Sequence, residues 1–496
     1  MALYIHNIRF KHACNSSSDH DLLIFGPEST MPAEDVSVVN DGHPEYASQY
    51  GWEDFVLIQK KYKLDWLGAI LSYALVERNT PQYILDYFVK EWLEGHSLEA
   101  QIDHQSVLWL PCEYGTDLPS KQFFGELKEF VLNPRLAIVG GNDNEKGKDY
   151  GGESVLQRIG CLRGNDNCVC RKDERGDFWI LYNQKTGMRI RLSFKDQVPA
   201  VAAEFPELVD MKLTNYCEND CQFCYQGSSP TADRDCDDYL WEWTSLLYSM
   251  KVFEVALGGG ELFHAYRHKP YVLANILKEF RKAGIVPNIT TADTTWIYNP
   301  ELRDPVLEHC GRIAFSVSST MSVEYLWDKL QRADFPREKT VFQVIEGVEY
   351  NLASTVSTCN NLRIPLVILG FKPPKEVPGR KPFNRRVKEE HVVRELEKII
   401  EEAVATTWRP SIVSVDTLFI KRYADSLKGV DALLYTGSEG THSMYFDLTN
   451  ETMGPTSYGD LRVVIPTDGN TNNDWEGEVG RIFRSWQDPL FAAGLK

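Results

Sequence analysis

The chain has 496 residues, of which 43% are hydrophobic, and carries a formal net charge of -18 at pH 7. It is too long for one ordinary domain, and its acidic balance argues against a general nucleic-acid binder, which needs concentrated Lys and Arg for phosphate contacts. No stretch is apolar for long enough to span a bilayer, and the first residues lack the basic and apolar segments of a signal peptide, so we expect a cytoplasmic protein without a membrane partner.

Residues 1–200 are expected to form an N-terminal α+β accessory domain, whose role the sequence does not indicate. Two helices with a buried apolar stripe are predicted within it, at residues 64–75 and 80–93. The second has Thr80 as its N-cap and Pro81 at its first helical position.

A β-hairpin is predicted at the end of this region. The apolar segments Phe178–Tyr182 and Arg189–Phe194 flank a turn at Asn183–Gly187. We expect the hairpin to cap or extend the domain that follows. Upstream, the Gly-rich residues 140–152 lack the Gly-Lys-Ser/Thr ending of a phosphate-binding loop, so they are expected to form a solvated loop.

A cysteine motif follows the apolar run Leu208–Leu213, which predicts a strand. Cys217, Cys221 and Cys224 lie in the loop after this strand, and Phe223 directly precedes the third cysteine. In α/β proteins this carboxyl edge is where ligands bind. A cubane cluster normally takes four thiolates and a structural zinc site four ligands, so three thiolates leave one metal position open, as catalytic sites do. A zinc knuckle or a chance grouping is the alternative.

Strand, loop and helix alternate from residue 208 onward, which indicates a parallel sheet and an α/β fold. Expected strands are Leu208–Leu213, Phe253–Leu257, Val286–Thr291, Arg312–Ser318, Ile364–Leu369 and Ile412–Val415. Expected helices are Tyr239–Met250, Tyr271–Ala283, a segment from Val323, Val341–Leu352 and Glu389–Thr406. These units make up residues 201–420. Residues 421–496 are expected to be a short extension with a hairpin from Ser443 to Tyr458 and a terminal helix.

The second expected strand ends in Gly258, Gly259, Gly260 and Glu261. Consecutive glycines let a backbone approach a ligand closely, because no Cβ intervenes. The carboxylate of Glu261 can accept a hydrogen bond from a ligand ammonium group. A tight turn after a strand is the alternative reading of such a glycine run.

The Cys-x₃-Cys-x₂-Cys spacing and the Gly-Gly-Glu segment together resemble the signature of the radical S-adenosylmethionine (SAM) superfamily. The resemblance covers residues 208–416. It implies an open (β/α)₆ partial barrel in which Cys217, Cys221 and Cys224 hold a [4Fe–4S] cluster and SAM chelates the fourth iron. Gly258 to Glu261 would bind the SAM amino group. Reductive cleavage of SAM would yield a 5′-deoxyadenosyl radical that abstracts a hydrogen atom from the substrate.

The same resemblance implies SAM contacts at the ends of the following strands. It assigns Thr291 to the third strand end, Ser316 and Ser318 to the fourth, and Leu369 to the fifth, the last as an apolar contact to adenine. Ala292–Asp293 departs from the family's Asn-Gly at the third strand end. Hydroxyl groups that satisfy local backbone groups are the alternative for the two serines.

Other polar groups on this edge of the sheet have simpler readings. The basic, Pro-rich segment Phe371–Lys388 is hypothesised to meet an anionic substrate or an acidic partner, with a solvated loop as an equal alternative. His264 and His268 are expected to be surface histidines at helical spacing rather than proton carriers.

The chain has 11 cysteines, an odd number that suits metal ligation in a reducing compartment better than a disulfide framework. None follows Cys359, so the C-terminal extension is cysteine-free and cannot hold an auxiliary cluster. A second metal site could be formed by Cys161, Cys168 and Cys170 with Cys14 or Cys112, although their spacing matches no known site.

The sequence therefore predicts a radical SAM enzyme that receives an electron from a flavodoxin or ferredoxin. A peptide or protein is the first candidate substrate, and a small metabolite or nucleoside is the second. A non-catalytic iron–sulfur or zinc binding module is the alternative from another class. We expect no nucleic-acid partner.

Overall fold

A computed structural model describes residues 168–187, 189–193, 203–232, 240–405, 413–427, 440–465 and 475–487, together with short strands and single residues closer to the N-terminus. The predicted helices at 64–75 and 80–93 lie outside the described residues except for Leu64, and so does the loop at 140–152 except for Gly140. Among the described residues, no helix combines the length and the apolar character needed to cross a membrane.

An antiparallel sheet contains the predicted hairpin. Its strands run in the order β4-β6-β1-β9-β8-β7 within the described residues. β8 and β9 pair as predicted, with Asn183–Gly187 between them. The bounds are β1 (Ala2–Arg9), β4 (Phe55–Leu57), β6 (Leu136–Gly140), β7 (Cys168–Asp173), β8 (Phe178–Asn183) and β9 (Arg189–Ser193). A separate pair comprises β3 (Gln49–Tyr50) and β5 (Gln101–Ile102).

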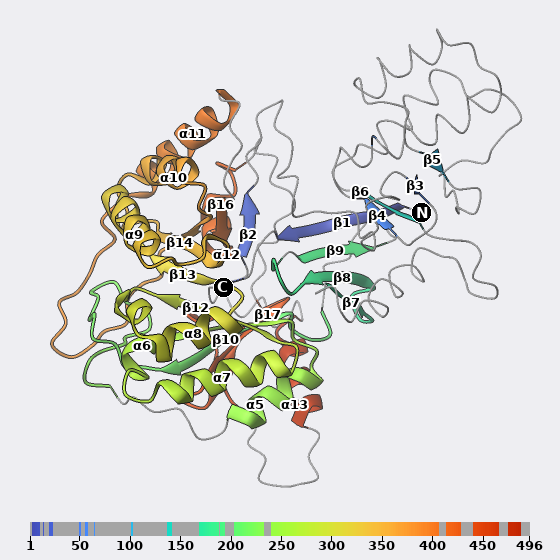
Figure 1. Cartoon of the computed structure of the whole chain (residues 1–496), viewed down its shortest axis with the longest axis horizontal. Helices are drawn as coiled ribbons and strands as arrows, with labels where there is room; N and C mark the ends of the chain where they lie inside the picture. The colour runs from blue at the N-terminus through green and yellow to red at the C-terminus, as the bar shows by residue number, and fades with distance from the viewer. Residues whose placement is uncertain are drawn as a thin grey trace, which may run out of the picture.

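The second large sheet carries the predicted parallel strands, in the order β19-β18-β17-β10-β11-β12-β13-β14-β15-β16-β2 (Figure 1). Each strand from β10 to β16 is parallel to the next. The bounds are β2 (Asp19–Leu22), β10 (Leu208–Thr214), β11 (Glu254–Gly259), β12 (Val286–Thr291), β13 (Ile313–Ser316), β14 (Thr340–Ile345), β15 (Leu366–Leu369), β16 (Val413–Asp416), β17 (Ser443–Asp447), β18 (Thr452–Gly454) and β19 (Val463–Val464). The α/β class with a parallel sheet is confirmed.

One strand of this sheet contradicts the predicted order of elements. Residues 341–352 were expected to be a helix, but β14 occupies Thr340–Ile345 and pairs with β13 and β15. A continuous apolar run of this length does not by itself distinguish a buried strand from a buried helix. Counted from β10, the strand that ends at Leu369 is consequently the sixth, and the fifth ends at Ile345.

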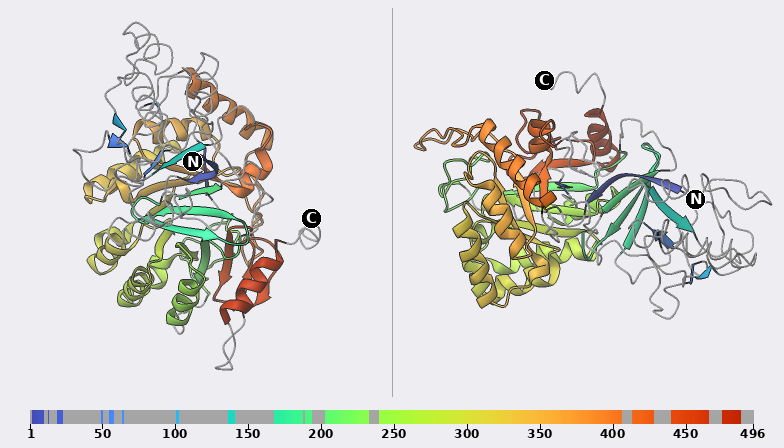
Figure 2. Two further views of the ribbon diagram at one scale, coloured as in Figure 1. Left: turned by 90° about the vertical axis from the view of Figure 1, so that its right-hand side faces the viewer. Right: turned by 90° about the horizontal axis from the view of Figure 1, so that it is seen from above.

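Helices follow most of the parallel strands and lie along the outside of the sheet, in an arc that Figure 2 shows from two sides. Their bounds are α5 (Leu240–Ser249), α6 (Leu262–Ala265), α7 (Pro270–Lys282), α8 (Pro300–His309), α9 (Thr320–Arg332), α10 (Leu352–Asn361), α11 (Glu389–Ala405), α12 (Thr417–Tyr423) and α13 (Trp475–Ser485), with short 3₁₀ turns η2 (Thr295–Tyr298) and η3 (Arg337–Lys339). The predicted α5, α7, α9, α11 and α13 are confirmed. The sequence missed α8, although Asn299 caps it and Pro300 begins it.

The two faces of the parallel sheet differ in chemistry because strand side chains alternate between faces. On β10, Val209 and Met211 belong to the large hydrophobic core that the strands share with the helices. Asp210 and Lys212 therefore point to the other, inner face, where both are buried. The Lys212 Nζ atom lies 3.1 Å from Asp447 Oδ2 on β17. At β10 and β17 the inner face therefore carries buried charged groups, while Ala314, Val341 and Val367 form an apolar cluster apart from the main core.

Strand pairing joins segments that the sequence assigned to separate regions. β2, from the predicted accessory domain, pairs antiparallel with β16, and β17, from the predicted extension, pairs parallel with β10. The β8 side chain of Tyr182 also stacks on Phe253, with ring centroids 5.1 Å apart. The division at residues 200 and 420 stays a prediction, but the sheet crosses both positions.

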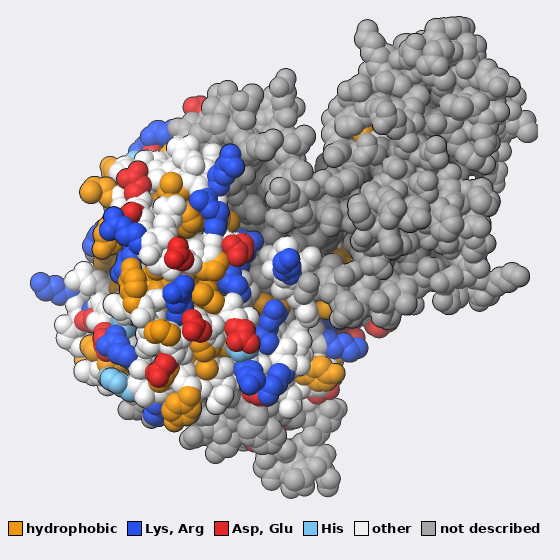
Figure 3. All heavy atoms as spheres, in the orientation of Figure 1, with side chains coloured by type: hydrophobic (Ala, Val, Ile, Leu, Met, Phe, Trp, Pro, Cys, Tyr) orange, Lys and Arg blue, Asp and Glu red, His pale blue; other side chains and the backbone are white. Residues whose placement is uncertain are grey.

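The described surface carries charges of both signs. On the face shown in Figure 3, Lys and Arg side chains alternate with Asp and Glu, and the described residues form no continuous basic patch there.

Candidate active site at the carboxyl ends of the parallel strands

The loop after β10, residues 215–232, carries the three cysteines and is here called the cysteine loop. Cys217, Cys221 and Cys224 are all free and half-buried. The Cys217 amide donates to the Ser229 carbonyl (3.1 Å), and the Ser229 amide donates to the Asn215 carbonyl (3.1 Å). These bonds close the loop at its base, while the Cys224 amide donates to the Cys221 carbonyl (3.1 Å) across a tight turn. The thiols are therefore presented from one short, closed segment.

The surroundings of Cys217 favour its neutral thiol. Burial, together with the Glu261 carboxylate, Cys221 and Cys224, raises the pKa of Cys217 to about 12, against a hydrogen bond with the Asn219 backbone. Within the part of the chain that the structure describes, no group of three His, Cys, Asp or Glu side chains is arranged to hold a single metal ion. A bound iron centre would reverse the preference for neutral thiols, since a coordinating thiol is deprotonated.

Two of the predicted glycines hold the cysteine loop against β11. The Gly260 amide donates to the Thr214 carbonyl (2.7 Å). A Cβ at Gly259, whose φ is +111°, would lie 2.4 Å from the Thr214 carbonyl oxygen, and one at Gly260 would lie 2.1 Å from that of Tyr216. A Cβ at Gly258 would meet no heavy atom within 4 Å. Close backbone packing explains why residues 259 and 260 are glycines. Of the three glycines, only Gly258 has open space at its Cβ position.

Glu261 lies between the ends of two neighbouring strands. Its side chain is buried, and its two carboxylate oxygens accept hydrogen bonds from Thr291 Oγ1 (2.9 Å) and from the amides of Ala292 (2.9 Å), Asp293 (3.3 Å) and Phe263 (3.4 Å). Burial raises the pKa of Glu261 to about 7, against these hydrogen bonds. The carboxylate thereby joins the ends of β11 and β12, and its predicted contact to a ligand ammonium group stays a prediction.

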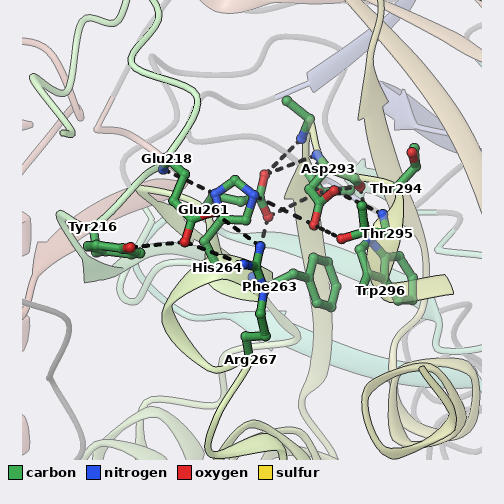
Figure 4. Close-up of polar contacts among 12 residues, drawn as sticks. Tyr216, Glu218, Glu261, Phe263, His264, Arg267, Asp293, Thr294, Thr295 and Trp296 are labelled. Atoms are coloured by element: carbon green, nitrogen blue, oxygen red, sulfur yellow. Dashed lines mark hydrogen bonds and ion pairs between the residues drawn. The ribbon is translucent and has the colours of Figure 1, made fainter. Parts of the chain in front are cut away.

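His264 is buried, which corrects the expectation that it lies on the surface. Figure 4 shows its ring between Glu218 and Asp293. Its Nδ1 accepts a hydrogen bond from the Glu218 amide in the cysteine loop (3.1 Å), and its Nε2 lies 3.6 Å from Asp293 Oδ2. Burial lowers the pKa of His264, which favours the neutral ring that can accept at Nδ1. The imidazole thereby connects the loop next to Cys217 to the end of β12.

The remaining SAM contacts implied by the resemblance lie at the ends of β12, β13 and β15, and they differ in how far their side chains are exposed. The Thr291 hydroxyl is buried and donates to Glu261, so its local role is structural. Ser316 is exposed at the end of β13 and accepts a hydrogen bond from Gln343 Nε2 (2.9 Å). Ser318 is also exposed, and Leu369 is half-buried at the end of β15. Gln343 on β14 was missed because its segment was predicted to be helical.

The basic loop Phe371–Lys388 packs on the cysteine loop instead of standing free. The Phe383 ring meets Phe223 edge-on, with centroids 5.8 Å apart. Arg385 forms ion pairs with Glu346 and with Glu389. Among the basic residues of this loop, Arg385 is thus engaged inside the protein, while Lys381 and Arg386 are exposed.

The C-terminal extension also reaches the cysteine loop, which the sequence did not indicate. The Tyr225 hydroxyl donates to Ser457 Oγ (3.1 Å) directly after the third cysteine. The Lys372 ammonium lies 4.6 Å from the centroid of the Tyr225 ring and 5.0 Å from that of Tyr458. Such cation–π contacts hold the cysteine loop between the segment that follows β15 and the C-terminal extension.

The proposed second metal site stays untested. Cys168 and Cys170 lie on β7, where they pair with Asn183 and Leu181. Their three possible partners, Cys14, Cys112 and Cys161, lie outside the described residues.

Comparisons with known proteins add little to this geometry. No family model and no curated protein matches the chain. The solved structures that resemble it include Streptococcus suis SuiB bound to S-adenosylmethionine, at 13% identity and a TM-score of 0.43, covering 67% of this chain and 90% of that one. SuiB bound to its precursor peptide SuiA gives 12% identity and a TM-score of 0.44 over the same shares. The structure of anSMEcpe with bound AdoMet gives 12% identity and a TM-score of 0.38, covering 56% and 84%. At scores this low, function has to be argued from the site.

Proposed function

We propose that the chain is a radical SAM enzyme. One observation carries the proposal: three free thiols on a single closed loop lie at the carboxyl end of β10, and the base of that loop accepts a hydrogen bond at the Tyr216 carbonyl from the amide that follows the glycine segment of β11. Both features lie where the strand-to-helix loops of a parallel sheet converge on ligands.

The donor set fits the cofactors. Cys217, Cys221 and Cys224 would hold a [4Fe–4S] cluster with one iron left for SAM, because the three thiols belong to one loop and cysteine thiolates are the usual ligands of such clusters. The backbone at Gly258, the position with open space, and the exposed Ser316 hydroxyl would face SAM. Once reduced by one electron, this pair of cofactors supplies a carbon-centred radical.

The protein's own residues would bind and orient the cofactors and shield them from water. The edge-on Phe223–Phe383 contact covers one side of the cysteine loop and would keep water from the cluster. His264 and Glu261 tie the loop and the glycine segment to β12, so the cofactor contacts would be held in one register. We keep three further SAM contacts in the proposal: the backbone of Thr291, and the side chains of Ser318 and Leu369.

The substrate would enter at the polar inner face of the sheet. Asp210 is buried there, its Oδ2 has no hydrogen-bond partner, and burial raises its pKa to about 8. A peptide or protein substrate is proposed first, because the C-terminal hairpin borders the cysteine loop through Ser457. A small metabolite or nucleoside is the second candidate. A flavodoxin or ferredoxin would supply the electron.

A direct test is anaerobic reconstitution of the full chain with iron and sulfide. We expect about four irons per chain, and release of 5′-deoxyadenosine from SAM when dithionite is added. Replacing Cys221 by Ala should abolish both, because only two thiolates remain. The matched control is Cys310→Ala, which removes a buried core thiol instead. One tightly bound zinc in place of iron would favour the binding-module alternative and overturn the proposal.

A further inference from the structure

Arg380, in the basic loop, lies across the cysteine loop. Its side chain is only 5% exposed. Its Nη2 atom donates to Asp220 Oδ1 (2.5 Å) and to the Ser228 carbonyl (2.6 Å). Asp220 directly precedes Cys221, and Ser228 follows the last cysteine. The guanidinium group therefore spans the part of the loop that carries Cys221 and Cys224.

The other nitrogen atoms of this guanidinium group are left without partners. Nε and Nη1 are both buried and make no hydrogen bond. Leaving a buried donor unsatisfied costs about 1–3 kcal/mol, and more when the group is charged. Native structures rarely keep such donors without an ordered water, an ion or another ligand to satisfy them. Two free donors on one buried cation in contact with the cysteine loop indicate an acceptor that occupies the site when the thiols are loaded.

The position of Arg380 is set by contacts on both sides. Its own amide donates to the Val377 carbonyl (3.0 Å), which forms a turn in the basic loop. Phe383 anchors the following residues on Phe223. The guanidinium group also acts on the Cys221 thiol: burial and Cys224 raise the pKa of Cys221, while Arg380 opposes them. The group is thus held in place before any cluster binds.

We propose that Arg380 donates its Nε and Nη1 hydrogen bonds to sulfur atoms of the bound iron–sulfur cluster and thereby raises the cluster's reduction potential. The inference rests on the proposed function, because it requires the cluster. Hydrogen bonds to cluster sulfur and a nearby positive charge both stabilise the reduced form, which carries one more electron. Arg380 would make the cluster easier to reduce by its electron donor.

The experiment is a redox titration of the anaerobically reconstituted full chain, followed by electron paramagnetic resonance of the reduced cluster. Arg380→Gln should shift the midpoint potential to more negative values and change the spectrum. Arg380→Lys, which keeps a charge without the planar fork, should shift it less. Lys381→Gln, which removes the exposed charge next in the chain, should leave the potential unchanged.

The outcomes separate this inference from the proposed function. A wild-type chain that binds no iron would overturn the proposed function itself. A wild-type cluster whose potential and spectrum are unchanged in Arg380→Gln would overturn only the role of Arg380. If Arg380→Gln retains no cluster, Arg380→Lys decides: a negative shift supports the inference, and the wild-type potential contradicts it.

Discussion

Replacing Glu207 by Gln is expected to destabilise the folded chain by about 3–5 kcal/mol, the cost of breaking a buried ion pair by removing one partner. The Glu207 carboxylate is buried and receives Arg191 through both oxygens, at 2.7 and 2.9 Å. Arg189 Nη1 lies 2.7 Å away, and it is buried as well. The neutral amide would remove the negative charge that these two buried guanidinium groups share. The midpoint of chemical denaturation measures the loss.

The pH dependence of this loss has a definite sign. Burial alone would raise the pKa of Glu207, but Arg189, Arg191 and His442 lower it well below its usual 4.5. A carboxylate with a depressed pKa in the folded state contributes stability above its unfolded pKa and loses it as the pH falls through the folded value. The difference between wild type and Glu207→Gln should therefore be constant from neutral pH to about 4.5 and shrink only below it.

A matched control is available on the surface. Glu279 pairs with Lys282 along α7, where both side chains are about half exposed. Glu279→Gln should cost under about 1 kcal/mol, as surface ion pairs do. Glu207 precedes β10 in the parallel sheet, and its partners Arg189 and Arg191 lie on β9 in the antiparallel sheet. Equal destabilisation by the two variants would show that these buried ion pairs do not hold the two sheets together.

Gly260→Ala is expected to abolish loading of the iron–sulfur cluster while the chain remains folded. The new Cβ would lie 2.1 Å from the Tyr216 carbonyl oxygen and 2.7 Å from its carbonyl carbon, both of them backbone atoms that cannot turn aside. The base of the cysteine loop must move away from β11, which breaks the bonds that hold the loop next to the glycine segment. Overpacking of this kind costs about 1–3 kcal/mol, so the fold should survive. Iron content per chain and circular dichroism measure the two effects.

Gly258→Ala is the control two residues away. No heavy atom lies within 4 Å of its Cβ position, so stability and iron content should match the wild type. If this backbone faces SAM, the variant should bind SAM more weakly despite its intact cluster. Loss of iron in both variants, or in neither, would contradict the packing role assigned to Gly260.

Residue spacing alone was enough to predict the main elements of the site. The cysteine triplet, the glycine run after the second strand and the hairpin at residues 178–194 are local patterns, and the chain positions them where predicted. Most strands of the parallel sheet were found because each is an apolar run bounded by polar loops. Such features depend on neighbouring residues, so the sequence carries them without reference to the fold.

The tertiary structure decided which partner each group meets. β14 was misjudged because its apolar run fits a strand or a helix equally well, and only pairing with β13 and β15 selects the strand. His264 was expected at the surface, yet it is buried and accepts a hydrogen bond from the cysteine loop, and the sequence did not indicate that Glu261 bonds to the end of β12. Arg380 meets Asp220 across 160 positions of sequence. Contacts at that separation are set by how the whole chain buries its apolar surface, and spacing along the sequence does not encode them.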